Sequence, residues 1–269
     1  MSLSATRFVD SHCHLDRLNL DAYDGNFEAM MSATRAAGVS HMLCIGVDLE
    51  SFPQVKALAE TYDHVFASVG CHPLYQSDEI ADEQTLRTLA THPKVVGIGE
   101  TGLDYFYAKD NKVLQQASFA MHIRAARDLD MPLIVHTRGA KEDTLGLLKE
   151  QGGGSVRGVL HCFTEDLDMA QQAIDLGFYI SISGIVTFAN AAELRDTVRA
   201  LPIERLLIET DAPWLAPVPF RGKPNEPRYV SHVAECVADL KGVSTETLAQ
   251  VTSNNFFTLF DQAKASQHS

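Results

Sequence analysis

The feature that most constrains the fold is a regular alternation of short apolar segments with longer segments of helical periodicity. Each apolar segment follows a polar segment of helical period and has the length of a buried strand, so the sequence predicts eight strands. The predicted strands are Arg7–Asp10, His41–Ile45, Val65–Val69, Val95–Ile98, Pro132–Val135, Val156–Leu160, Phe178–Ile182 and Arg205–Ile208.

The segments between these strands have the periodicity of helices. In Phe27–Ala37, Gln115–Leu129 and Asp168–Leu176, apolar residues recur at spacings of three and four. Gly38 and Gly177 stand just before the next strand, where helices commonly end in the left-handed conformation that glycine adopts easily.

Strand and helix alternate eight times without a linker rich in proline, glycine or serine. This order predicts an α/β fold with one closed (β/α)8 barrel, a TIM barrel, that forms a single domain over residues 1–269. A doubly wound open sheet would give the same alternation, so the pattern alone leaves it as the second interpretation.

Residues that can do chemistry follow most of the predicted strands at once. They are His12, His14, Glu100, His136, His161 and Asp211. The carboxyl ends of barrel strands meet at one mouth, where such folds place their active sites. Convergence at a mouth therefore favours the closed barrel.

The spacing of the first two histidines sets their direction. Because side chains alternate along a strand, His12 and His14 project from one side and Cys13 from the other. Either His136 or His161 alone would more often be a core or loop histidine than a ligand. Together, the six residues at corresponding positions predict a metal centre.

The donor types limit which metals fit. Imidazole and carboxylate donors without cysteine suit Zn²⁺, Mn²⁺ or Mg²⁺. Six donors are too many for one catalytic zinc, which usually takes three, so we expect two ions about 3.5 to 4 Å apart with a bridging carboxylate. Glu100 is the candidate bridge; one ion takes His12, His14 and Asp211, and the other takes His136 and His161.

Two acidic residues lie one layer deeper in the predicted strands. Asp10 and Glu209 precede His12 and Asp211 by two residues, so we expect them to accept hydrogen bonds from ligating imidazoles. A buried ion pair with an arginine is the alternative for Glu209.

Several residues near the predicted mouth fit contacts to substrate. His72 is expected to contact a phosphate or leaving group, with a loop hydrogen bond beside Pro73 as the alternative. Arg138, Arg221 and Lys223 could hold flanking phosphates, although solvated surface charge explains them equally well.

Aromatic side chains also cluster in the predicted loops. Tyr105, Phe106 and Tyr107 follow Glu100, and Trp214 follows the Asp211 motif. Exposed aromatic rings at such a mouth can stack unpaired bases, as in single strands or frayed ends. Packing of these rings against the barrel rim is the alternative.

The net charge and the cysteine content limit which binding partners and which cellular compartment fit the chain. The net charge of -13 opposes the attraction to phosphate that duplex-DNA binders use, so nucleic acid would need local positive charge such as metal ions. The five cysteines (Cys13, Cys44, Cys71, Cys162 and Cys236) are odd in number and lack CxxC spacing, which favours reduced thiols. Met1–Asp10 does not look like a secretory signal and no segment looks membrane-spanning, so we expect a cytoplasmic protein without a membrane partner.

The chain resembles the TatD family of metal-dependent deoxyribonucleases. The matching segments, in the family's order, are Phe8–Asp16, Ser68–Pro73, Gly97–Tyr105, Pro132–His136, His161–Thr164 and Ile208–Trp214, and the match extends to Asn225–Pro227 and Asn254–Asn255.

The resemblance implies a TIM barrel of the metal-dependent hydrolase type and two divalent ions held by the six residues above. It also implies DNA as substrate, exonuclease or endonuclease action, and a role in DNA repair or degradation. Asp211, Glu100 and His72 are the candidate catalytic residues, and Asp211 would orient the attacking water and accept its proton.

Other activities stay open at this point. A metal-dependent ester or amide hydrolase, such as a D-aminoacyl-tRNA deacylase, would use a similar cavity. Barrel amidohydrolases often bridge their ions with a carboxylated lysine, whereas this chain has Glu100, which favours the phosphodiesterase. A non-catalytic scaffold would predict missing ligands. Cys13 and Cys162 are disfavoured as nucleophiles because each lies next to a predicted ligand, so its sulfur is expected to point away from the cavity. The sequence does not fix the oligomeric state, and a monomer stays open.

Overall fold

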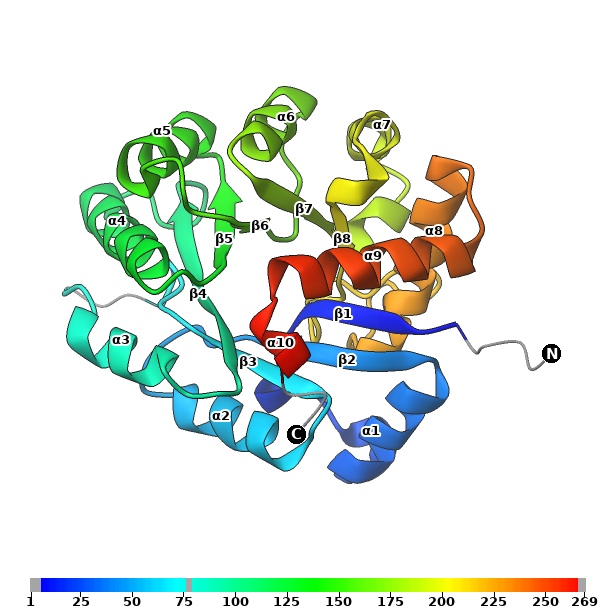
Figure 1. Ribbon diagram of the computed structural model, residues 1–269. Coiled ribbons are helices and arrows are strands. Elements are labelled where there is room, and N and C mark those ends of the chain that lie inside the picture. The colour runs from blue at the N-terminus through cyan, green and yellow to red at the C-terminus, as the bar shows by residue number, and fades with distance from the viewer. Residues whose placement is uncertain (1–5, 76–78, 266–269) are drawn as a thin grey trace.

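The computed structural model describes residues 6–75 and 79–265, and the remaining residues of the expected 1–269 domain lie outside the described residues. Eight parallel strands form one sheet in chain order, with helices around it (Figure 1). The strands are β1 (Phe8–Cys13), β2 (Val39–Cys44), β3 (Val65–Val69), β4 (Val95–Asp104), β5 (Leu133–Arg138), β6 (Gly158–Leu160), β7 (Phe178–Ile182) and β8 (Leu206–Ile208). The helices are α1 (Phe27–Ala36), α2 (Phe52–Thr61), α3 (Glu83–Ala90), α4 (Lys112–Asp128), α5 (Lys141–Gly152), α6 (Leu167–Asp175), α7 (Ala192–Ala200), α8 (Val230–Lys241), α9 (Thr245–Leu259) and α10 (Gln262–Ala265).

Hydrogen bonds bring the first strand to the end of the last one. The Ser11 hydroxyl donates to the Ile208 carbonyl at 3.0 Å. Beyond β8, the Asp211 N–H donates to the His12 carbonyl at 2.9 Å and the His14 N–H donates to the Ala212 carbonyl at 2.8 Å. The protein is therefore a (β/α)8 TIM barrel, and the open doubly wound sheet is excluded.

Local sequence signals explain where the helices begin and end. The Asn26 and Asp166 side chains accept hydrogen bonds from the N–H groups of Ala29 and Met169 and so cap the first turns of α1 and α6. After these two helices, Gly38 and Gly177 have φ angles of 91° and 92°. The predicted left-handed glycines are confirmed.

Two apolar layers hold the barrel together. The larger one packs outward-facing strand residues such as Met42 and Ile180 against the surrounding helices. The smaller one joins inward-facing residues of the strands with Phe256 of α9 and with Phe260. In Figure 1, α9 and α10 lie across this end of the barrel. Apolar packing thus fills one end and leaves the carboxyl ends of the strands for polar side chains.

Three strands run further than the sequence predicts. β1 continues to Cys13, β4 to Asp104 and β5 to Arg138, so His12, Glu100 and His136 lie within strands rather than after them. The apolar segments end where the buried surface changes from apolar to polar. Strand pairing does not end there, because the backbone ladder does not depend on side-chain polarity.

The cysteines are free thiols as predicted, and Cys13, Cys44 and Cys71 are buried. None of the helices in the described part of the chain combines the length and the apolar character that a membrane span requires.

Candidate metal centre

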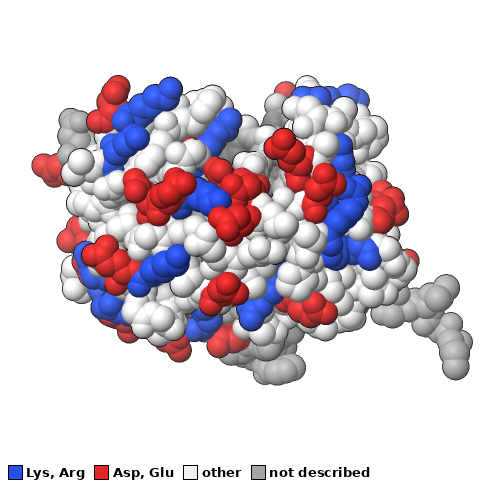
Figure 2. All heavy atoms as spheres, turned by 90° about the horizontal axis from the view of Figure 1, so that it is seen from above, with Lys and Arg blue, Asp and Glu red and all other residues white. Residues whose placement is uncertain are grey.

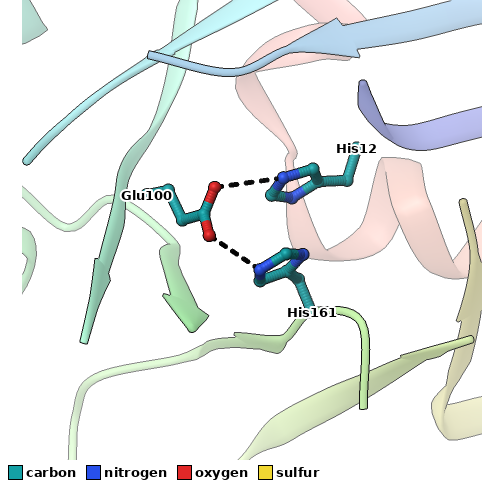
Figure 3. A group of neighbouring side chains, drawn as sticks. All are labelled: His12, Glu100 and His161. Atoms are coloured by element: carbon teal, nitrogen blue, oxygen red, sulfur yellow. Dashed lines mark ion pairs between the residues drawn. The ribbon is translucent and has the colours of Figure 1, made fainter. Parts of the chain in front are cut away.

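A buried carboxylate from β4 lies at the centre of the site. Glu100 Oε2 is 3.2 Å from His12 Nε2, and Oε1 is 2.8 Å from His161 Nε2, so its two oxygens face different histidines (Figure 3). The two imidazole rings stack, with centroids 3.8 Å apart. Residues from β1, β4 and the loop after β6 therefore meet on one carboxylate.

One group of donors lies on the Oε2 side of Glu100. His12 and His14 both turn Nε2 toward Asp211 Oδ1, at 3.7 and 3.4 Å. His14 Nε2 is 4.0 Å from Glu100 Oε2. Asp211 has a φ of 56°, a left-handed turn directly after β8 that carries its side chain to this group. The structure brings together His12, His14 and Asp211 as the sequence predicts.

A second group lies on the Oε1 side. His161 Nε2 is joined there by His136 Nδ1 at 3.5 Å and by His72 Nε2 at 3.2 Å. All six predicted ligands thus converge on one cavity. His72, which the sequence analysis places outside the ligand set, also touches the central carboxylate.

Two further carboxylates fix the orientation of ligand rings. Asp104 Oδ2 accepts from His136 Nε2 at 3.0 Å, and Glu209 Oε1 accepts from His161 Nδ1 at 3.3 Å. Because one nitrogen of each ring donates outward, the other can present its lone pair to the cavity. The prediction for Glu209 is confirmed, and no arginine pairs with it among the described residues.

The role of Asp104 goes beyond the predictions made from the sequence. The signal was available, since Glu100, Gly102 and Asp104 alternate on one face of a strand. Gly102 permits the close pairing with β5: a Cβ there would lie 1.9 Å from the His136 carbonyl oxygen, and its φ is 137°. The apolar segment ends at Ile98, so apolar patterning alone does not extend the strand to Asp104.

The prediction for Asp10 is wrong. Its carboxylate accepts from the Thr210 N–H at 2.9 Å, from the Thr210 hydroxyl at 2.5 Å and from the His12 backbone N–H at 3.4 Å, and binds no imidazole. The register of β1 shifts between Asp10 and Cys13, which breaks the strict alternation on which the expectation rested. Asp10 instead joins β1 to the turn that carries Asp211.

His72 has a defined tautomer. Its Nδ1 accepts from the Leu74 backbone N–H at 3.1 Å, so in the neutral ring the proton is on Nε2, which faces Glu100. The ring therefore offers the cavity a donor rather than a lone pair. The loop hydrogen bond considered as an alternative is present, and it determines what His72 presents to the site.

The acidic and basic side chains in the cavity stabilise each other's charged forms. Burial would raise the pKa of Glu100, but His161, His72 and His12 outweigh it and hold that pKa well below its usual range. Burial would lower the pKa of His161, but Glu100 and Glu209 raise it well above the usual value. A divalent cation would take the place of that proton between the two side chains.

Unpartnered polar atoms show that the cavity suits metal ions. His12 Nδ1 and His14 Nδ1 are buried and have no hydrogen-bond partner among the described residues, while His12 Nε2 and His161 Nε2 face Glu100 oxygens without a well-directed hydrogen bond. Buried nitrogen atoms without partners are costly unless something binds them. Three sets of donors lie close enough to share an ion: His12, Glu100 and His161; His12, His14 and Asp211; and His72, Glu100 and His136.

All of these donors except the more deeply buried His12 line a cavity of about 400 Å³ that opens at the mouth of the barrel. Arg138, Tyr107 and Trp214 line it as well, and the Trp214 side chain is 46% exposed. The Trp214 ring meets the His14 ring edge to face at 5.1 Å. These three residues therefore stand where a substrate would enter.

Other residues singled out from the sequence do not line this cavity. The Tyr105 hydroxyl is bound by Asp143 and Gln116, and Arg221 stacks on Phe188. Phe106 lies beside Arg138, and Lys223 follows the cavity-lining part of the loop after β8.

The two cysteines considered as nucleophiles differ in position. Cys13 Sγ is buried and lies 3.5 Å from the Leu43 carbonyl, away from the cavity as expected. Cys162 does line the cavity, contrary to expectation, because its backbone has a φ of 44°. Burial and nearby Asp211 raise the pKa of its thiol well above the usual value, which disfavours a nucleophilic thiolate.

The outer surface viewed over α5, α6 and α7 carries acidic and basic side chains interspersed, without a continuous basic band (Figure 2). This agrees with the net charge of -13. On this face, an anionic substrate would meet no continuous basic surface.

Known proteins share this chain's sequence and fold over nearly its whole length. The profile of the family described as TatD related DNase matches residues 9–261. The chain is 50% identical to the uncharacterized metal-dependent hydrolase YcfH of Escherichia coli K12 over 94% of this chain and 95% of that protein. It is 39% identical to the uncharacterized metal-dependent hydrolase YabD of Bacillus subtilis, over 93% of this chain and 98% of that protein.

A solved structure agrees in fold. The TatD homologue YjjV of Escherichia coli superposes with a TM-score of 0.85 at 31% identity, covering 95% of this chain and 98% of that one. With the barrel and the histidine–carboxylate clusters at its mouth, these matches show that the chain belongs to the TatD related DNase family of metal-dependent hydrolases.

Proposed function

We propose that the protein is a phosphodiesterase that hydrolyses DNA with two divalent ions at the mouth of its barrel. The observation that carries the proposal is the position of Glu100, whose two oxygens face separate groups of donors. A carboxylate in that position suits a bridge between two ions, and paired ions are typical of enzymes that displace groups at phosphorus.

The donors divide between the two ions without conflict. His12, His14 and Asp211 would hold one ion, and His136 Nδ1 with His161 Nε2 would hold the other. Mg²⁺, Mn²⁺ and Zn²⁺ all accept nitrogen and oxygen donors. When bound, such ions supply a nucleophile from water at neutral pH and neutralise charge on the phosphoryl oxygens.

The protein's own residues do the remaining work. Asp211 is the acidic donor nearest the opening, with a side chain 14% exposed, and would orient the attacking water and take its proton. Burial would raise the pKa of Asp211, but His14 and His12 lower it, so the carboxylate is ionised at neutral pH. His72 would donate its Nε2–H to a phosphoryl oxygen or to the leaving group.

The rim favours single strands or ends of DNA as the substrate. Tyr107 and Trp214 are 64% and 46% exposed beside the cavity, where rings can stack unpaired bases. Exonuclease action and a part in DNA repair or degradation would follow from this preference. Free thiols fit a reducing compartment, so we place the reaction in the cytoplasm.

The test is cleavage of an end-labelled single-stranded DNA oligonucleotide by protein that has been stripped with a chelator. Adding back Mg²⁺, Mn²⁺ or Zn²⁺ in turn should restore a ladder of products, and Asp211→Asn should give no ladder. The direction of the ladder would report the polarity.

Metal content separates the outcomes of this test. If two ions bind per chain and no ion restores cleavage, the deoxyribonuclease proposal is wrong. An ester or amide substrate, with a D-aminoacyl-tRNA first, would then be tried, because the same cavity can polarise a carbonyl group.

A further inference from the structure

Arg138, at the end of β5, is a cation at the mouth of the cavity that has no acidic partner within residues 6–75 and 79–265. Its guanidinium makes no ion pair with any residue in the described part of the chain, and the residue lines the cavity that holds Glu100. Six of the 13 arginines pair with a carboxylate among the described residues: Arg17, for example, pairs with Asp16 and Asp48. An unpaired guanidinium beside a catalytic cavity is available to an anion on the substrate.

Two aromatic rings hold the guanidinium in place. Its central carbon lies 4.4 Å from the centroid of the Phe106 ring and 4.7 Å from that of Tyr107. The two rings are perpendicular to each other, so at most one of them can stack on the flat face of the guanidinium, and such stacking leaves the N–H groups at its edge free to bind an anion. Little further ordering is then needed when the anion arrives.

The loop that carries these rings is braced from below. Asp104 Oδ1 accepts from the N–H groups of Phe106 and Tyr107 at 2.9 and 2.7 Å. The Tyr105 N–H donates to the Arg138 carbonyl at 3.0 Å. The other oxygen of Asp104 binds the His136 ring, so one carboxylate sets both a ligand histidine and the support of the arginine.

The chain offers a comparison within itself. Arg221 also stacks on a ring, that of Phe188 at 4.4 Å, and also makes no ion pair with a described residue. It does not line the cavity, whereas Arg138 does. Position at the mouth, rather than lack of a partner, is what distinguishes Arg138.

We propose that Arg138, supported by Phe106 and Tyr107, forms a second anion subsite that binds the phosphate next to the one being hydrolysed. This inference rests on the proposed function and specifies its substrate class. The preferred substrate then carries at least two phosphates in sequence, as an oligonucleotide or a phosphorylated end does, and an isolated diester is a poor substrate. The exposed Tyr107 ring lies where the nucleoside joining the two phosphates would pass.

The kinetic test compares substrates with and without a neighbouring phosphate. For the metal-loaded protein, kcat/KM is measured on dTpdT, on pdTpdT, on dTpdTp and on bis(4-nitrophenyl) phosphate. We expect the wild type to prefer one of the two phosphorylated dinucleotides by about tenfold over dTpdT, the size of one charged hydrogen-bonded contact. Arg138→Gln should remove that preference, and the matched Arg221→Gln should keep it.

Salt dependence gives a second reading of the same contact. On a longer single strand, the slope of log KM against log salt concentration should become shallower by about 0.7 in Arg138→Gln, as for the loss of one phosphate contact. An unchanged slope together with an unchanged substrate preference would overturn the subsite.

A binding measurement separates this inference from the proposed function. Trp214 is the single tryptophan and adjoins His14, so its fluorescence can follow the binding of thymidine 3′,5′-bisphosphate and of thymidine 5′-monophosphate. Arg138→Gln should weaken the bisphosphate about tenfold more than the monophosphate. If that holds while no diester is cleaved, the subsite stands and the phosphodiesterase proposal fails; if both nucleotides weaken equally, the subsite is wrong.

Discussion

At the scale of single residues, Asp104 shows how a buried carboxylate can define a metal ligand from behind. It accepts a hydrogen bond from His136 Nε2, which leaves Nδ1 of that ring to face Glu100. Burial would raise the pKa of Asp104, but the hydrogen bond from His136 and those from the loop N–H groups lower it, so the group acts as an acceptor. The direction of one proton therefore decides whether His136 can bind an ion.

Replacing Asp104 by Asn tests this dependence. Asn can still accept from the loop N–H groups, but it would turn an NH2 group toward His136 Nε2, which favours the ring tautomer with its proton on Nδ1. We expect affinity for one of the two ions to fall by about 10- to 100-fold, because that nitrogen loses its lone pair. Metal titration followed by Trp214 fluorescence would measure it. Asp143→Asn, outside the cavity, is the control, and wild-type affinity for both ions in Asp104→Asn would refute the role.

A second buried residue, His122, is forced to stay neutral. Its Nδ1 donates to the Ser118 carbonyl at 2.8 Å, and its Nε2 accepts from the Cys71 N–H at 3.1 Å, directly before His72. Burial lowers the pKa of His122 from 6.5 to about 4. Protonation would place a charge in the core and remove the acceptor that holds the loop after β3.

The pH dependence of stability follows from that lowered pKa. Between pH 6.5 and about pH 4 the unfolded chain binds a proton at His122 that the folded chain does not, so stability falls as the pH falls through this range. The loss from this one group is about 3 kcal/mol when complete. Denaturant unfolding at pH 7, 5.5 and 4.5 should show that the free energy of unfolding falls less with pH in His122→Gln than in wild type. If the free energy of unfolding fell equally in the two proteins, His122 would not be the source of this pH dependence.

At the scale of elements, the loop between β4 and α4 is organised by the first turn of the helix. The Gln115 side chain accepts from the Asp104 N–H at 2.7 Å and donates to the carbonyls of Asp104 and Ala108 at 3.2 and 2.8 Å. A buried amide with its hydrogen bonds satisfied specifies one loop conformation. The helix thus sets where Tyr107 and the carboxylate of Asp104 lie.

The identity and order of the elements could be predicted from the sequence, but the ends of the critical strands could not. Apolar segments revealed each strand because burial of both faces leaves a continuous apolar pattern. β4 continues past Ile98 through Glu100 to Asp104, where the pattern turns polar although the ladder with β5 persists. Hydrophobicity reports burial in an apolar layer, and the metal centre is buried in a polar one.

The candidate site shows the same division. The six predicted ligands could be found because each belongs to a strand or the turn after it, and strands of a barrel share one mouth. The tautomer of His72 could not be predicted from the sequence, since it depends on a hydrogen bond from the Leu74 backbone N–H. The expected contact between Asp10 and an imidazole rests on regular alternation, and the shifted register of β1 sends its carboxylate to Thr210 instead.

At the scale of the whole molecule, stability and chemistry are concentrated at opposite ends of the barrel. The end covered by α9 is filled by apolar side chains, including Phe256, Phe260 and Val96. The mouth contains buried histidines with unpartnered nitrogen atoms, an arrangement that costs stability until ions bind. The apolar end must therefore supply stability that the mouth does not.

Phe260→Ala tests this separation. The Phe260 ring is fully buried, lies 4.8 Å from the Phe256 ring and packs among inward-facing strand residues, so its removal should leave a cavity. We expect a loss of about 3 to 5 kcal/mol and a melting temperature lower by on the order of 10 °C. Metal stoichiometry and affinity at 25 °C should be unchanged, because no ligand strand ends at that face.

His14→Ala should do the reverse, weakening metal binding with a much smaller change in the metal-free melting temperature. If Phe260→Ala weakened metal binding as strongly as His14→Ala, the two ends would be coupled and the separation would be wrong.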